Sequence, residues 1–348
     1  MDPVTQGVLG TTASQLVSKP SQKILAAVLG FLSGMAPDLD VLIQSSHDPL
    51  FSLEYHRHFT HALVFIPFGA LICAAVFYVV LSIVSKKTNY YSQEGTSHLG
   101  FKTVYLFCFS GYATHALLDA CTTYGTQLLW PFSDARIAWN NVSVIDPLFT
   151  LPLMVLTALA VFRRSTLMGW LAAIYALTYL SLGVWQNNRA HDIAHELAIS
   201  RGHQAINLGL KPSFANIVVW KSVYEYQGRY YVDAIRVGFD SKIYTGSSTA
   251  KLDVDQHLSW LDRNSQQAKD IERFRWFSND HLGIDPSNPN RIIDIRYSLT
   301  PNRLDGMWGI TLDPNASSSA HIEWTHSRPK GQALKKQTSQ LWAMILGR

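Results

Sequence analysis

Histidine and aspartate residues gather in three short clusters whose spacing suits metal coordination. The first is Pro37-Asp38-Leu39-Asp40, at the end of an apolar segment. Two carboxylates two residues apart, after a proline, suit an irregular turn that points both at one hard or borderline cation. Proline and aspartate are also common in ordinary loops that end helices. This cluster therefore has both a functional and a structural interpretation.

The second cluster, residues 56–61, contains three histidines and leads into a long apolar run. His56 and His61 are five residues apart, so a turn can bring both imidazoles toward one centre. Imidazole is a common ligand for zinc and other borderline metals. Arg57 adds a permanent positive charge and a planar fork suited to phosphate or carboxylate. The alternative is an interfacial anchor, in which the cationic side chain reaches the lipid headgroups.

The third cluster lies inside an apolar run. His115 and Asp119 are four residues apart, so on a helix they share one face. Ionisable groups in an apolar span are costly and usually functional. Asp119 can act as a ligand or can hold an imidazole tautomer for a neighbouring ligand. Burial of both residues without a metal is the structural alternative.

Long apolar runs predict the helices that must position these clusters. Residues 62–84 are apolar for 23 residues without a charge, which is enough to cross a bilayer core of about 30 Å. The runs 4–17 and 24–35 are too short to span, and we expect them to form a helical hairpin that dips into the bilayer. We predict further membrane helices at 104–118, 147–162 and 167–185.

The basic residues between these runs predict an orientation. Lys86, Lys87, Arg163 and Arg164 fall on the cytoplasmic side by the positive-inside rule. The three clusters and Asp146 then converge on the opposite face.

The second half of the chain has the composition of an ordinary soluble domain. We predict helices at 188–202 and 254–277, a loose helix beyond 330, and strands at 214–223, 229–239, 292–299, 307–312 and 321–326. The fold class is therefore α+β. An all-α transmembrane helical bundle (1–187) precedes a soluble mixed α/β domain (188–348), which the orientation places outside the cytoplasm.

Composition narrows the classes of function. A net charge of +4 in 348 residues is too weak to predict a nucleic-acid partner. The three cysteines lie in the apolar half without a CxxC pair, as small buried hydrophobes do. His191 and His195 have the i, i+4 spacing of metal ligands, but no glutamate lies between them, which favours a solvated helix face. Asp146 precedes Pro147, so it can cap a helix or take a role at the site.

The combined pattern resembles the YdjM-like family of membrane-bound metal-dependent hydrolases over about the first 190 residues. The matching motifs are Pro37-Asp38-Leu39-Asp40, His56-Arg57-His58-Phe59-Thr60-His61, Gly111-Tyr112-Ala113-Thr114-His115-Ala116-Leu117-Leu118-Asp119, Gly125 and Leu129-Trp130-Pro131. The family often has a histidine where this chain has Gln6, which could supply only an amide oxygen, and a glycine where it has His58. The family also resembles, at a distance, zinc-dependent phospholipases C and related nucleases, and that resemblance implies phosphodiester substrates.

We therefore predict a metal-dependent hydrolase in a bacterial inner membrane. It would use one or two divalent ions, with zinc expected, and act on a lipid or lipid-linked substrate reached from the leaflet. The predicted metal ligands are Asp38, Asp40, His56, His61, His115 and Asp119, and the predicted catalytic residues are Arg57, Asp40 and Asp146. The alternatives are a metal-ion transporter and a metal-stabilised scaffold whose soluble domain binds a partner. Substitution of Arg57 distinguishes a scaffold, which should tolerate it, from an enzyme.

Overall fold

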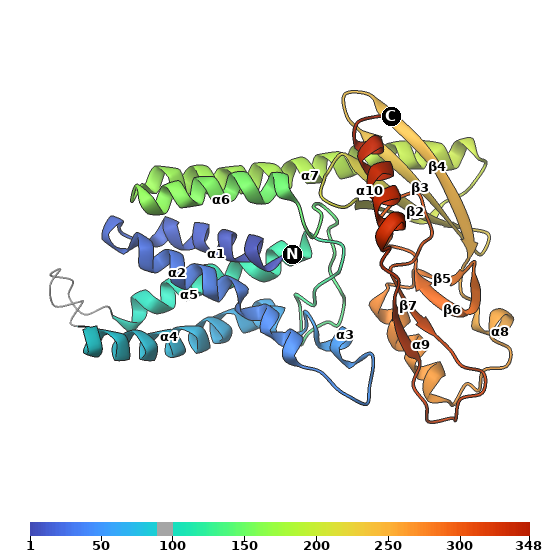
Figure 1. The fold of residues 1–348 in the computed structure, drawn as a ribbon, viewed down its shortest axis with the longest axis horizontal. Helices are drawn as coiled ribbons and strands as arrows, with labels where there is room; N and C mark the ends of the chain where they lie inside the picture. Colours follow the sequence, from blue (N-terminus) through green and yellow to red (C-terminus); the bar gives the residue numbers. More distant parts are fainter. Residues whose placement is uncertain (89–99) are drawn as a thin grey trace. The chain divides into compact units, whose positions relative to one another are not determined.

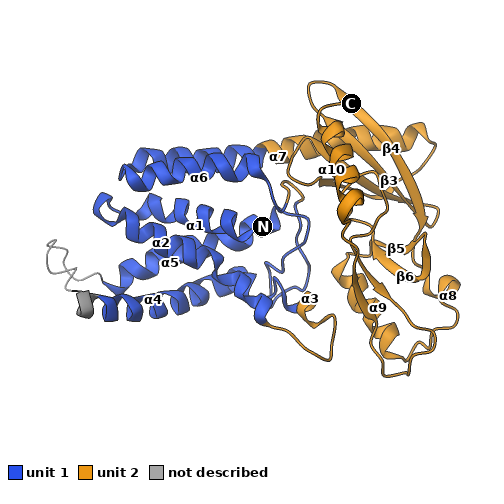
Figure 2. Cartoon of the chain, viewed as in Figure 1, with its two compact units in different colours: residues 1–42, 55–139, 144–181 blue, residues 43–54, 140–143, 182–348 orange. Residues whose placement is uncertain are grey.

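The computed structural model describes residues 1–88 and 100–348, and these residues form two compact units (Figure 2). The first, called the helical unit below, comprises Met1–Leu42, Tyr55–Trp139 and Val144–Ser181. The second, called the sheet unit, comprises Ile43–Glu54, Asn140–Ser143 and Leu182–Arg348. The α+β class is confirmed, with a helical N-terminal region followed by two antiparallel sheets and further helices.

Helices α1, α2, α4, α5 and α6 and the first part of α7 make up the helical unit (Figure 1). Their bounds are α1 Pro3–Val17, α2 Lys23–Met35, α4 Ile66–Thr88, α5 Phe101–Ala120, α6 Pro147–Phe162 and α7 Thr166–Ser200. Two helix starts follow from their sequences, because Asp2 and Asp146 each precede a proline and accept hydrogen bonds from the first free N–H groups. Short 3₁₀ segments adjoin α2 and α4. They are η1 Pro20–Gln22 before α2, η2 Ala36–Leu42 after it, and η3 Phe59–His61 and η4 Leu63–Phe65 before α4.

Three helical segments of the described chain are long and apolar enough to cross a membrane: Pro20–Leu42, Leu63–Val84 and Thr166–Ser200. The predicted spans 62–84 and 167–185 correspond to the second and third of these segments. The expectation that 24–35 is too short was wrong, because the 3₁₀ turns on both sides of α2 extend it to 23 residues. Neither α5 nor α6, in both of which we predicted a crossing, is among the three, and α6 is a shorter apolar helix.

Glycines allow α1, α2 and α5 to pack closely. A methyl group added at Gly30 would lie 2.6 Å from the carbonyl oxygen of Gly10, and one added at Gly111 would lie 2.5 Å from that of Gly30. Small residues at helix crossings permit such backbone contact, which dispersion and polar contacts stabilise in an apolar environment. One such contact is the 2.9 Å hydrogen bond from Ser14 Oγ to the carbonyl oxygen of Phe107. The third cluster, on α5, is thereby fixed against the N-terminal helices.

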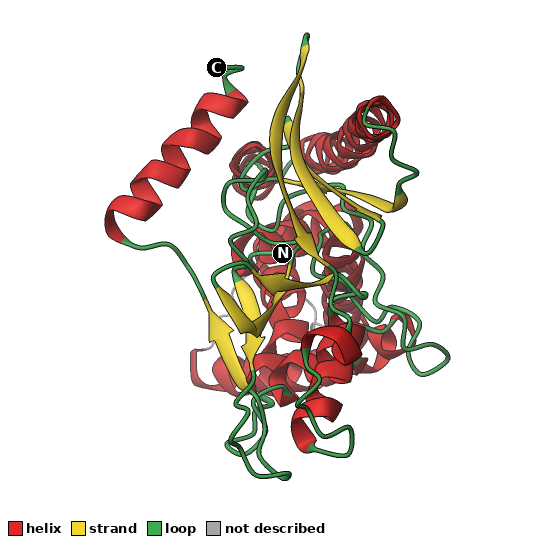
Figure 3. Ribbon diagram, turned by 90° about the vertical axis from the view of Figure 1, so that its right-hand side faces the viewer, coloured by secondary structure: helices red, strands yellow, loops and turns green. Residues whose placement is uncertain are grey.

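The sheet unit contains two four-stranded antiparallel sheets, ordered β1-β2-β3-β4 and β5-β6-β7-β8 (Figure 3). The strands are β1 Ile206–Pro212, β2 Val219–Tyr226, β3 Arg229–Val237, β4 Ser241–Ala250, β5 Leu282–Asp285, β6 Asn288–Asp294, β7 Trp308–Thr311 and β8 Glu323–His326. The helices are α3 Phe51–Tyr55, α8 Val254–His257, α9 Gln266–Phe277 and α10 Gly331–Ile345, with the end of α7. One core cluster joins the two sheets: Val223, Tyr230 and Val232 contact Ile293 and Ile295.

The structure corrects several predicted boundaries. The predicted helix 254–277 is two helices, because Asp253 and Ser265 each cap a separate N-terminus. The predicted helix 188–202 is the continuation of α7, which stays helical to Ser200 and ends before Gly202 (φ +72°). Strands β1, β4 and β5 were not predicted. The predicted strands at 229–239, 307–312 and 321–326 and the helix beyond 330 are confirmed.

Candidate metal centre

Four side chains from three elements of the helical unit form a compact cluster. Asp38 comes from η2, His61 ends η3, and His115 and Asp119 lie near the C-terminal end of α5. Both imidazoles and Asp119 are fully buried, and one ligand atom from each of the four residues lies within 4.8 Å of the others. The cluster could therefore hold a metal ion.

The distances between these ligand atoms fit one shared cation. His61 Nε2 and His115 Nε2 are 3.0 Å apart. Asp38 Oδ1 is 3.6 Å from the first nitrogen and 3.3 Å from the second. Asp119 Oδ2 is 3.2 Å and 3.6 Å from the same two atoms. Ligands about 2.0–2.1 Å from a tetrahedral ion would be about 3.3–3.4 Å apart, so these separations have the scale of a zinc coordination shell.

Hydrogen bonds orient both imidazoles with Nε2 toward the cluster. His115 Nδ1 lies 2.5 Å from the carbonyl oxygen of Gly34, which can only accept, so Nδ1 carries the proton. His61 Nδ1 lies 3.0 Å from Thr60 Oγ1 and 3.3 Å from Asp40 Oδ2. A partner on the far nitrogen is the usual way in which proteins fix the tautomer of a metal-binding histidine.

Asp40 organises the second cluster from behind His61. Its Oδ1 is 2.7 Å from His56 Nδ1, and its Oδ2 accepts hydrogen bonds from Arg57 N (2.8 Å) and Thr60 Oγ1 (3.1 Å). Asp38, Asp40 and His56 form a second group whose ligand atoms are mutually within 4.8 Å. Asp38 belongs to both groups, so the arrangement can accommodate one or two ions.

Arg57 is buried against the cluster in an unusual backbone conformation. Its φ of +63° is in the left-handed region, where the hydrogen bond from its N–H to Asp40 holds it. The guanidinium Nε lies 3.0 Å from Asp119 Oδ2, Nη1 donates to Thr122 Oγ1 at 3.0 Å, and the group stacks over Tyr124 at 4.7 Å. The arginine therefore places a fixed positive charge beside the candidate ligands.

The carboxylates give the cluster an electrostatic preference for cations. Burial alone would lower the pKa of His61, but the carboxylates of Asp119, Asp38 and Asp40 raise it to about 10. An excess of buried negative charge that retains a proton so strongly also favours a divalent cation in its place.

The cluster is open at one edge. The side chains of Asp38 and His56 are 18% and 23% exposed, whereas those of Asp40, His61, His115 and Asp119 are inaccessible to solvent. The solvent-accessible side of the two ligand groups is therefore at Asp38 and His56.

Gln6 supports the cluster in a way that the sequence did not predict. Its side-chain amide donates from Nε2 to Asp119 Oδ1 at 2.8 Å, so it orients a carboxylate of the cluster. The Met1 amino group also contacts Asp119 Oδ1. Sequence reasoning also missed Gly34, because a backbone carbonyl acceptor leaves no signal in residue type.

Three of the sequence candidates lie apart from the two ligand groups. Asp146 is buried as the cap of α6, where it accepts from the Leu148 and Phe149 N–H groups and from Tyr179 Oη at 2.9 Å. His191 and His195 are exposed on α7, which agrees with the prediction that they lie on a solvated helix face. These contacts support a capping role for Asp146, whose catalytic role stays a prediction.

Comparison with known proteins agrees with the membrane helices. The model of the YdjM inner membrane protein family matches residues 1–190, more than half of the chain. The uncharacterized protein YfhP of Bacillus subtilis (strain 168) is 26% identical over 154 residues, which are 42% of this chain and 42% of that protein. The match thus covers less than half the length of that relative.

The remaining comparisons add no further relationship. No solved structure matches the chain significantly. The expected distant similarity to zinc-dependent phospholipases C and nucleases is not borne out by these matches. The helices, the candidate spans and the match over residues 1–190 show that the chain belongs to the YdjM inner membrane protein family.

Proposed function

We propose that this protein is a membrane-bound metal-dependent hydrolase that acts on lipid or lipid-linked phosphodiesters. The observation that carries the proposal is the buried His61–His115 pair, with its two Nε2 atoms 3.0 Å apart between the carboxylates of Asp38 and Asp119. Two imidazoles and two carboxylates are a donor set that zinc and other borderline divalent metals favour.

Each group has a role in this proposal. Asp38, His61, His115 and Asp119 would hold the first ion, and Asp38, Asp40 and His56 provide room for a second. A bound divalent cation acts as a Lewis acid and lowers the pKa of a coordinated water toward about 7. Asp40 would fix the His61 ring and is the candidate general base.

Arg57 would neutralise charge on a substrate phosphate. Its Nε and Nη1 already contact Asp119 and Thr122, whereas Nη2 makes no hydrogen bond within the described part of the chain. A guanidinium held rigidly beside a reacting centre stabilises developing negative charge without having to reorganise.

The surroundings of the open edge support a lipid substrate. Leu39, which lies between the two aspartates of η2, and Leu42, which lies two residues after the second, are 63% and 75% exposed. Phe68, shortly after His61, is 57% exposed. Exposed apolar side chains beside a polar site suit the membrane interface, from which an acyl chain can enter laterally.

The position of the ligands favours hydrolysis over transport. Asp38 lies near the end of Pro20–Leu42, His61 precedes Leu63–Val84, and His115 and Asp119 are in the last two turns of α5. A transport path would place polar groups at several depths of the membrane, whereas these gather at helix ends. By the positive-inside rule, we propose that this end faces away from the cytoplasm.

A structural metal is the second candidate, because three of the four groups have inaccessible side chains, as in closed structural sites. Substitution of Arg57 separates the two functions. We expect Arg57→Gln to retain its metal and to lose hydrolysis about 10²–10³-fold, the usual effect of removing one transition-state donor. A scaffold would show no hydrolysis in either protein.

The experiment uses the full chain purified in detergent. Bound metal is measured by mass spectrometry, and hydrolysis of bis(p-nitrophenyl) phosphate and of phosphatidylcholine and phosphatidylglycerol is measured in mixed micelles. The control is the double variant His191→Ala/His195→Ala. It removes two exposed histidines that have the same i, i+4 spacing as His115 and Asp119. Stoichiometric metal without hydrolysis of any of these substrates would refute this proposal in favour of the structural metal.

A further inference from the structure

The segment between the first two ligand clusters belongs to the sheet unit. Residues Ile43–Glu54 follow η2, which carries Asp38 and Asp40, and they end two residues before His56. Whatever holds this segment therefore constrains the chain on both sides of the metal centre.

One arginine of α9 holds the segment by two carboxylates. Arg273 Nη1 and Nη2 donate to Asp48 Oδ1 and Oδ2 at 3.0 and 2.7 Å. Its Nε and Nη2 donate to Glu54 Oε1 and Oε2 at 2.6 and 3.0 Å. Arg273 thus makes two bidentate pairs, the geometry in which arginine–carboxylate contacts are strongest and most directional.

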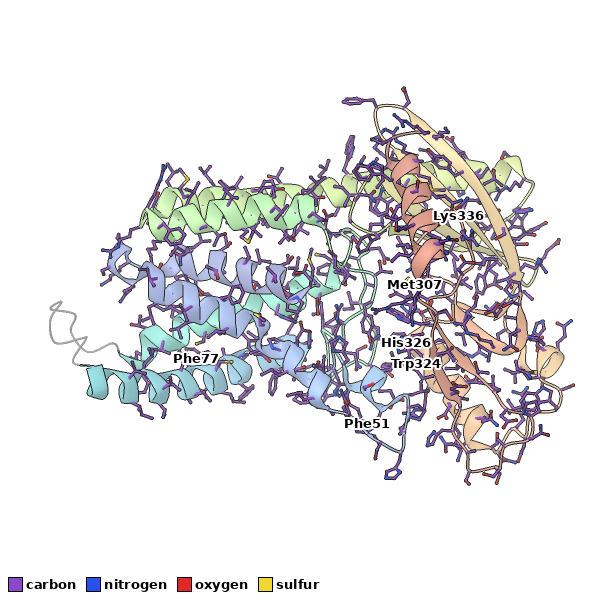
Figure 4. The ribbon with its side chains drawn as sticks, viewed as in Figure 1. Phe51, Phe77, Met307, Trp324, His326 and Lys336 are labelled. Atoms are coloured by element: carbon purple, nitrogen blue, oxygen red, sulfur yellow. The ribbon has the colours of Figure 1, made fainter. Side chains whose placement is uncertain are left out.

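The arginine is itself anchored in the core of the sheet unit. Asp270, which is fully buried, accepts from Arg273 Nη1 at 2.9 Å and from the Ile322 N–H at 3.3 Å, and lies 2.8 Å from His321 Nδ1. Phe274, the next residue of α9, is inaccessible and contacts Trp324 of β8; Figure 4 labels Trp324. The guanidinium is therefore a fixed point of the sheet unit.

The two clamped carboxylates also shape the segment. Asp48 Oδ1 accepts from the Leu50 N–H at 3.0 Å, and the Asp48 carbonyl accepts from the Phe51 N–H, so α3 begins at Phe51 (Figure 4). Leu50 is 1% exposed. Glu54 lies in the last turn of α3, immediately before Tyr55 and the histidine cluster. Without Arg273, the like charges of Asp48 and Glu54 would face one another.

We propose that Arg273 is a positioning residue that couples the sheet unit to the metal centre. By clamping both ends of the segment that contains α3, it limits the conformations open to His56 and Arg57, which must meet Asp40. This inference rests on the proposed metal centre, and it assigns to the C-terminal half a role in setting metal affinity. Loss of supporting contacts behind metal ligands typically costs about 10–100-fold in affinity.

The test compares Arg273→Met with Arg275→Met in the full chain in detergent. Arg275 is two residues further along α9 and pairs with Glu272 and Asp280, outside the clamped segment, so it is a matched control. Co²⁺ affinity and the visible spectrum of bound Co²⁺ are measured by titration. Hydrogen exchange is measured for peptides covering residues 48–61 and for β2 and β3.

We expect Arg273→Met to bind Co²⁺ at least tenfold more weakly, with an altered spectrum and faster exchange at 48–61 but unchanged exchange in β2 and β3. Arg273→Lys should be intermediate, because it keeps the charge and loses the fork. Unchanged affinity and exchange at 48–61 would refute the inference.

Two further outcomes remain decisive. If Arg273→Met does not fold, the double variant Asp48→Asn/Glu54→Gln removes the clamp from the segment side and leaves α9 intact; the same losses support the inference, and their absence overturns it. If the wild-type protein binds no Co²⁺, the proposed metal centre fails, and the exchange at 48–61 alone decides whether Arg273 fixes the segment.

Discussion

At the scale of single residues, the facing Nε2 atoms of His61 and His115 carry most of the chemical information. Both rings have their Nδ1 atoms committed, to Asp40 and Thr60 in one case and to the Gly34 carbonyl in the other. Two imidazole nitrogens 3.0 Å apart can share at most one proton, whereas one cation satisfies both lone pairs. We therefore expect the positions of the His61 and His115 rings to depend on whether a metal ion is bound.

His115→Ala should remove the metal because it deletes a ligand on α5 and leaves the other three in place. We expect bound metal to fall to below about a tenth of the wild-type stoichiometry, while the helical circular dichroism stays within error. Mass spectrometry of the purified protein measures the loss, and His195→Ala, an exposed histidine, provides the comparison. Equal metal content in the two variants would contradict the assignment of His115 as a ligand.

At the scale of elements, the close packing of α1, α2 and α5 determines whether the third cluster reaches the others. His115 lies one helical turn after Gly111, whose α-carbon faces the backbone of Gly30. Because His115 and Asp119 continue along the same helix, separation of α5 from α2 moves both away from Asp38. Helix packing and metal binding are thus linked through a glycine.

Gly111→Ala should destabilise the helical unit by about 1–3 kcal/mol, because a Cβ there would lie 2.5 Å from the Gly30 carbonyl oxygen. The matched substitution Gly169→Ala on α7 brings its Cβ no nearer than 3.4 Å to Gln15, an ordinary contact. It should be neutral or stabilising by up to about 1 kcal/mol, since alanine is the better helix former. Thermal unfolding in detergent compares them, and equal midpoints would argue against tight packing at Gly111.

At the scale of the whole molecule, two units of different character share one chain. The N-terminal region has helices apolar enough to cross a membrane, and the C-terminal region has polar surfaces and two antiparallel sheets. The sheet unit also buries charge: Lys211 and Lys221 are opposite one another on β1 and β2. Such burial makes its stability depend on pH.

Stability should rise as the pH increases from about 7 toward about 10. Burial lowers the pKa of Lys211 to about 7, with Arg296 and Lys221 adding to the effect, and burial lowers that of Lys221 to about 7 as well. Between about 7 and the ordinary lysine value of about 10.4, the unfolded chain binds more protons than the folded chain, so raising the pH favours folding.

Lys211→Met should flatten this rise, whereas substitution of the exposed Lys269 by methionine should leave it unchanged. The measurement is the midpoint of thermal unfolding of the full chain at pH 7, 8 and 9. A wild-type midpoint that falls over this range would show that other groups dominate.

The proposed orientation predicts which introduced cysteines react with a reagent added outside the cell membrane. Cysteine substituted for Ser319, exposed in the sheet unit, should react with an impermeant maleimide in intact spheroplasts. Cysteine substituted for Arg163, exposed after α6, should react only after lysis. The reverse pattern would place the metal centre on the cytoplasmic side.

The sequence determined those features whose physical cause is local. Apolar length predicted the spans at 62–84 and 167–185, and period-two alternation predicted the strand at 229–239. The ligand clusters were visible because ionisable residues within an apolar span are costly and usually functional, and because three histidines lie within six residues at 56–61. Sequence periodicity did not predict β4, because most of its side chains are exposed or half-buried. It predicted α8 and α9 as one helix, because a capping residue interrupts a helix without changing its composition.

The tertiary structure decided what each candidate residue contacts. Asp38 and Asp40 are two residues apart, yet only Asp38 joins both imidazoles and Asp119, while Asp40 supports His56, Arg57 and His61 from behind. Nor could any spacing reveal that Arg273 clamps Glu54 from 219 residues away. Residue type determines which chemistry is available, whereas the distances and directions between groups remote in sequence follow from the packing of the whole chain.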